Sequence, residues 1–152
     1  IAGDENAVQE AITLAKAAGA RRAVLLPVSA PFHTSLMRPA AERLAPLLEK
    51  VALRESAVPV VSNVTAQPVS SPQEIRRLLI AQVASPVRWD DSVRTMVNMG
   101  VQTFVEIGPG STLSGLIRKT AQDVRVMRVE DRATLDATLS HLVAEAGSHG
   151  QA

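Results

Sequence analysis

Apolar residues recur along this chain with a helical spacing in six segments. Over residues 4–18 they return every three or four positions, between a cap at Asp4 and a stop at Gly19, which predicts an amphipathic helix. A proline at the first helical position, after the cap Ser71, predicts another helix start. The same spacing predicts helices over residues 36–51, 72–84, 89–99 and 113–117, and a last one through 135–142.

Short apolar runs lie between these predicted helices. They cover residues 23–28, 58–64, 101–107 and 124–129, and the first of them is long enough for a strand but too short for a helix. Strands that alternate with helices of this length favour an α/β fold, in which helices cover a mainly parallel sheet.

Composition narrows the classes of function. With 152 residues, 46% of them hydrophobic, the chain can bury the core of one globular domain. Sixteen basic and fifteen acidic residues leave a net charge of +1, so we expect no nucleic-acid partner and no membrane partner. The absence of cysteine from the sequence excludes disulfides, thiolate zinc sites and a cysteine nucleophile, and it is compatible with the expected cytoplasmic location.

The first residues are unlike a signal peptide, because residues 1–5 hold two acids and no basic cluster before an apolar stretch. Residues 1–3 resemble the end of a strand that enters a helix cap. We therefore expect the chain to be a fragment of a longer protein.

Two residues are candidates for chemistry. His33 follows a predicted strand in a loop, where α/β folds place functional side chains, and histidine is the usual general base at neutral pH. A lone histidine specifies little, and a capping or packing role stays open. Gln82 lies seven residues after Ile75, on the inward side of its helix, where its amide needs hydrogen-bond partners.

The turn at Gly108-Pro109-Gly110 has two interpretations. Its amides could bind an anion, but a tight turn before a packed helix is favoured, since neither a P-loop ending nor a dinucleotide fingerprint is present. The sequence contains no Gly-x-Ser-x-Gly elbow for a nucleophilic serine, and no metal-ligand spacing.

Four segments, in this order, closely resemble the malonyl-CoA:acyl-carrier-protein transacylases of fatty acid synthesis. They are PVSAPFHTSLMRPA (27–40), VPVVSNV (58–64), QVASPVRW (82–89) and EIGPGSTLSGL (106–116). The resemblance implies a ping-pong acyl transfer from malonyl-CoA, through a serine, to the phosphopantetheine thiol of acyl carrier protein, without a further cofactor or metal.

The resemblance also implies roles for residues of this chain. His33 matches the family's catalytic base, and Gln82 matches the glutamine that holds this histidine in place of a triad aspartate. Phe32 is similar to the residue that accompanies selection of malonyl over methylmalonyl, so we assign it to substrate binding. Asn63 is expected to support the same substrate site.

The implied fold is a hydrolase-like three-layer α/β core with a mainly parallel sheet and a ferredoxin-like insertion. Residues 1–27 would be the second part of that insertion, and residues 28–152 the C-terminal part of the core. The family's nucleophilic serine, oxyanion segment and malonate-binding arginine belong to the earlier half, outside this chain. We therefore expect that half, acyl carrier protein and a coenzyme A thioester as partners, and no activity from this chain alone.

Three alternatives remain at this point. The chain could be a noncatalytic module that binds acyl carrier protein, although the presence of both His33 and Gln82 argues against a decayed site. It could be the acyltransferase domain of a polyketide synthase. An oxidoreductase, with the turn at residues 108–110 on a dinucleotide and Glu130 on a ribose, ranks third because the fingerprint is broken.

Overall fold

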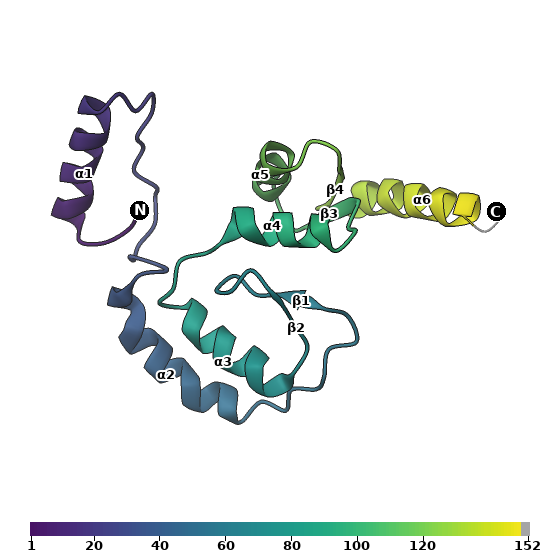
Figure 1. Ribbon diagram of the computed structural model, residues 1–152, viewed down its shortest axis with the longest axis horizontal. Coiled ribbons are helices and arrows are strands. Elements are labelled where there is room, and N and C mark those ends of the chain that lie inside the picture. The colour runs from purple at the N-terminus through teal and green to yellow at the C-terminus, as the bar shows by residue number, and fades with distance from the viewer. Residues whose placement is uncertain (150–152) are drawn as a thin grey trace. The chain divides into compact units, whose positions relative to one another are not determined.

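The computed structural model describes residues 1–149, and Figure 1 shows their helices and strands. The chain separates into two compact units, with the division between Arg88 and Trp89. Each unit has its own helices and its own two-stranded sheet.

The first unit contains three α-helices and one short 3₁₀ helix. Its elements are α1 (Glu5–Ala17), η1 (Ser35–Met37), α2 (Arg38–Glu49), β1 (Val60–Val61), β2 (Pro68–Val69) and α3 (Pro72–Gln82). The predicted caps are confirmed: the Asp4 side chain accepts from the Asn6 amide, and the Ser71 side chain accepts from the Glu74 amide. Strands β1 and β2 pair antiparallel, with Val60 opposite Val69.

Helices α2 and α3 pack against each other, and Arg76 of α3 reaches the C-terminal end of α2. Its Nε donates to the Leu48 carbonyl at 2.9 Å, and its Nη2 donates to the Val51 carbonyl at 2.8 Å. These carbonyls belong to the last turn of α2 and the residues after it, where the helix has no further amides to donate to them. The guanidinium therefore caps α2 from a neighbouring helix.

Replacing Arg76 by alanine is expected to lower the free energy of unfolding by about 2 kcal/mol, because two carbonyls lose a charged donor. Urea unfolding of the complete protein measures this loss. Arg77→Ala is the matched control, since the ion pair of Arg77 with Glu74 is exposed and its loss should change stability little. Equal effects of the two substitutions would contradict the capping role.

The strand predicted over residues 23–28 is wrong for the structure described. The segment has no regular secondary structure, and the relative exposures of Val24, Leu25, Leu26 and Val28 lie between 54% and 69%. A strand exists only through hydrogen bonds to a neighbouring strand, and nothing within residues 1–149 supplies them here. The predicted strand over 58–64 shortens for a related reason, since only Val60–Val61 has a partner.

The second unit is a β-α-β arrangement with a helix on either side in sequence. Its elements are α4 (Trp89–Asn98), β3 (Thr103–Ile107), α5 (Thr112–Thr120), β4 (Arg125–Val129) and α6 (Arg132–His149). Strands β3 and β4 pair in parallel, from Thr103 opposite Arg125 to Ile107 opposite Val129. Val93, Phe104 and Ile117 form its core, so each of α4, β3 and α5 contributes one fully or nearly buried apolar side chain. The helices and strands predicted for this part of the sequence are confirmed.

Within residues 1–149, every helix is too short or too polar to cross a membrane.

Candidate functional site

His33 lies in a tight loop before η1, and its backbone is left-handed, with φ of 61°. Two short-range hydrogen bonds shape this loop: the Phe32 amide donates to the Ala30 carbonyl at 2.9 Å, and the Thr34 hydroxyl donates to the Pro31 carbonyl at 2.8 Å. A left-handed conformation costs a residue other than glycine about 1 kcal/mol, and such residues cluster at functional sites. The loop directs an exposed imidazole away from its own backbone turn and toward the end of α3.

The imidazole of His33 is held at one nitrogen. Its Nδ1 lies 2.9 Å from the main-chain carbonyl oxygen of Gln82, the last residue of α3. A carbonyl oxygen only accepts hydrogen bonds, so Nδ1 must carry the proton. In the neutral ring, Nε2 then keeps its lone pair, which is the state that a general base requires.

The Gln82 carbonyl is available because α3 stops there. In a continuing helix this oxygen would accept from the amide four residues later, but that residue is Pro86, which has no amide hydrogen. Besides the His33 ring, it has a long contact from the Ser85 amide, at 3.3 Å. The signal in the sequence for this available carbonyl is Pro86, four residues after the histidine's partner, and helical periodicity alone does not show it.

The side chain of Gln82 reaches a second segment, the turn after β1. Its Oε1 accepts from the Asn63 side-chain amide at 3.4 Å, and both residues are half-buried. The Asn63 carbonyl in turn accepts from the Arg88 amide at 2.9 Å. The structure therefore brings together His33, Gln82 and Asn63, three of the four residues singled out in the sequence.

Phe32, the fourth of these residues, directly precedes His33 in the same loop. It is 47% exposed. Its place beside the histidine is fixed by the chain, and its assignment to substrate binding stays a prediction.

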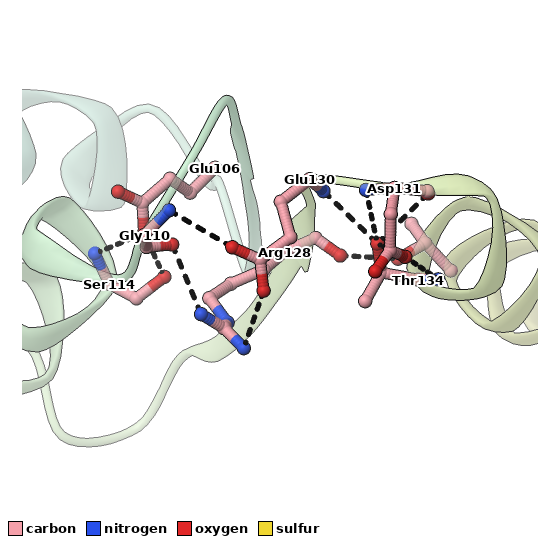
Figure 2. A network of polar contacts seen from close by, with 8 residues as sticks. Glu106, Gly110, Ser114, Arg128, Glu130, Asp131 and Thr134 are labelled. Atoms are coloured by element: carbon pink, nitrogen blue, oxygen red, sulfur yellow. Dashed lines mark hydrogen bonds and ion pairs between the residues drawn. The ribbon is translucent and has the colours of Figure 1, made fainter.

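The second unit contains a polar network around the turn at residues 108–110 (Figure 2). Glu106, at the end of β3, accepts from the Leu113 amide at 3.0 Å, from the Ser114 amide at 2.8 Å and from the Ser114 hydroxyl. The Gly110 amide donates to Glu130 at 3.0 Å. Three amides at this turn and the start of α5, those of Gly110, Leu113 and Ser114, are thus bound to carboxylates of the chain itself, which supports the interpretation as a structural turn.

The same network lowers the pKa of Glu106. The hydrogen bond from the Ser114 hydroxyl is the main cause, the amides of Ser114 and Leu113 and the charge of Arg128 add to it, and burial opposes it. A carboxylate with a lowered pKa in the folded state contributes stability above its unfolded pKa and loses that contribution as the pH falls through the folded value.

We therefore expect the unfolding free energy to fall on acidification below about pH 5, where Glu106 begins to take up a proton in the unfolded chain while the folded carboxylate stays charged. Glu106→Gln should be less stable than the parent at neutral pH, and its stability should depend less on pH in the acidic range. Urea midpoints measured between neutral and acidic pH test this. Parallel pH curves for the two proteins would show that Glu106 does not carry the effect.

Comparison with known proteins identifies close relatives of the chain. Residues 1–143 match the acyl transferase domain family. Over 145 residues the chain is 41% identical to the malonyl CoA-acyl carrier protein transacylase of Bacillus subtilis strain 168, covering 95% of this chain and 46% of that protein.

The solved structures that resemble this chain are of the same kind of protein. An acyl carrier protein S-malonyltransferase from Vibrio cholerae superposes with a TM-score of 0.85 at 41% identity, covering 90% of this chain and 44% of that one. A malonyl-transacylase in complex with a type II polyketide synthase acyl-carrier protein gives a TM-score of 0.87 at 40% identity, with 91% and 45% covered. The expected α/β fold is confirmed, and the chain spans about half the length of the proteins that it matches.

Proposed function

The chain belongs to the acyl transferase domain family, and from this premise we propose that it supplies the catalytic histidine of a malonyl-CoA:acyl-carrier-protein transacylase. The nucleophilic serine of that enzyme lies outside these residues. One observation carries the assignment of His33: its Nδ1 is bound to an oxygen that can only accept, which leaves Nε2 as the base.

The chemistry consists of two matched half-reactions. In the first, Nε2 of His33 takes the serine proton while the serine oxygen attacks the malonyl thioester carbonyl, and the same proton then goes to the departing coenzyme A thiolate. In the second, Nε2 takes the proton of the phosphopantetheine thiol, the thiolate attacks the malonyl ester, and the proton returns to the serine oxygen. The Gln82 carbonyl keeps its hydrogen bond to Nδ1 throughout, so the ring does not have to reorient between steps.

The partners of this reaction are proposals for the complete protein. They are malonyl-CoA, acyl carrier protein and the remaining half of the enzyme; we propose no metal or further cofactor, and we place the reaction in the cytoplasm. A relative's complex with its acyl-carrier protein supports the second partner. We further propose that Phe32 narrows the substrate pocket, that residues 1–27 belong to the ferredoxin-like part, and that residues 28–152 belong to the core.

The similarity to whole transacylases supports this function over a noncatalytic module and over a polyketide synthase domain. Native mass spectrometry of the complete protein after mixing with malonyl-CoA is the test. We expect one malonyl group per protein on the serine-bearing part, its transfer to added acyl carrier protein, and no malonyl group on this chain alone. A complete protein that binds acyl carrier protein without gaining malonyl would show the noncatalytic module instead.

A further inference from the structure

We infer that Asn63 is a positioning residue that acts on His33 through Gln82. In this arrangement the Asn63 amide holds the Gln82 side chain, and the main-chain carbonyl of the same glutamine holds the imidazole. The inference rests on the proposed function, in which His33 is the base, and it gives Asn63 a task other than contact with substrate.

The direction of the Gln82 carbonyl needs support from outside its helix. Oxygens inside a helix are aligned by the amide four residues later, and at Gln82 that amide is missing because of Pro86. The remaining contact from the Ser85 amide, at 3.3 Å, belongs to a loose final turn. The end of a helix frays readily, so an unsupported carbonyl would hold His33 in more than one orientation.

The Gln82 side chain supplies that support because its partner is itself fixed. The Asn63 carbonyl accepts from the Arg88 amide at 2.9 Å, and the Arg88 guanidinium donates to the Thr65 carbonyl at 3.2 Å. The Val64 amide donates to the Ser62 hydroxyl at 3.2 Å, which closes the start of the same turn. The glutamine is therefore held at its side chain by a hydrogen-bonded turn, while its carbonyl faces the histidine.

A contact with substrate and a positioning role predict different kinetics. Loss of a substrate contact raises KM for malonyl-CoA, whereas loss of a positioning contact lowers the acylation rate and leaves KM nearly unchanged. Positioning through Gln82 also predicts that changes at the two residues do not add, because each removes the same interaction.

The experiment is a double-mutant cycle in the complete enzyme, with Asn63→Ala, Gln82→Met and both together. Gln82→Met keeps the length of the side chain and removes its amide, and it tests the same contact should the first variant fail to fold. We expect each single change to slow serine acylation about 10-fold to 100-fold, with KM unchanged and the double variant no slower than the slower single one. Asn98→Ala, the same change at an exposed asparagine of α4, is the control and should leave the rate unchanged.

A second measurement needs no activity. Nitrogen-15 NMR of the histidine-labelled complete enzyme reports which ring nitrogen of His33 carries the proton, and we expect the Nδ1-protonated form in the parent and a mixture of both forms in Asn63→Ala. Additive effects in the cycle, a raised KM with an unchanged rate, or an unchanged tautomer would each overturn the inference. A parent enzyme that transfers no malonyl would refute the proposed function instead, and the NMR result would still decide the role of Asn63.

Discussion

Replacing His33 in the complete enzyme is expected to lower malonyl loading by about 1,000-fold, the range lost when a general base is removed. The ring is exposed, so its loss should disturb little packing. The sharper variant is His33→Asn rather than His33→Ala, because asparagine adopts the left-handed backbone of this position more readily and therefore keeps the loop. Single-turnover acylation followed by mass spectrometry measures the effect.

Gln82→Ala is the comparison for the histidine variants, and it should cost less activity than either of them. Alanine removes the side chain but keeps the main-chain carbonyl that binds Nδ1. Near-normal loading by His33→Asn and Gln82→Ala alike would refute both assignments. Loading that persists in His33→Asn but is lost in His33→Ala would indicate that the shape of the loop matters and the base does not.

The helices could be predicted because their signals are local. Asp4 and Ser71 make cap contacts to residues two and three positions away, and Pro72 fixes its own φ, so the sequence near each end is sufficient. Residues 23–28 had the composition of a strand, but pairing depends on a partner distant in sequence, and composition cannot supply it.

In the candidate site, too, the sequence predicts some features and not others. Helical periodicity placed Gln82 toward the interior, but a spacing of side chains says nothing about which atom meets the histidine, and the contact is made by the main chain. The left-handed backbone of His33 accompanies hydrogen bonds across residues 30–34, and the conformational preferences of histidine do not predict it. Glu106 likewise caps α5 from the preceding strand, a contact that spans the turn at residues 108–110.

Leu26→Asp is expected to prevent recovery of the complete enzyme. Within residues 23–28, four apolar side chains are each more than half exposed: Val24, Leu25, Leu26 and Val28. A run that is apolar on both faces is typical of a strand inside a parallel sheet. We propose that the remaining half covers this segment. Leu26→Asp would then lose the roughly 2 kcal/mol that burial of a large apolar side chain contributes, and it would add the cost of removing a carboxylate from water. Association of the two halves should therefore weaken about 1,000-fold.

Mixing this chain with the remaining half and recording native mass spectra tests this expectation. Leu47→Asp is the matched control: Leu47 is 61% exposed, and it lies on the outward side of α2, whose opposite side packs on α3 within the same unit. The complex should form with Leu47→Asp and not with Leu26→Asp. If both variants associate as well as the parent, residues 23–28 are not the contact; if both fail, the contact extends over α2, and the segment is only part of it.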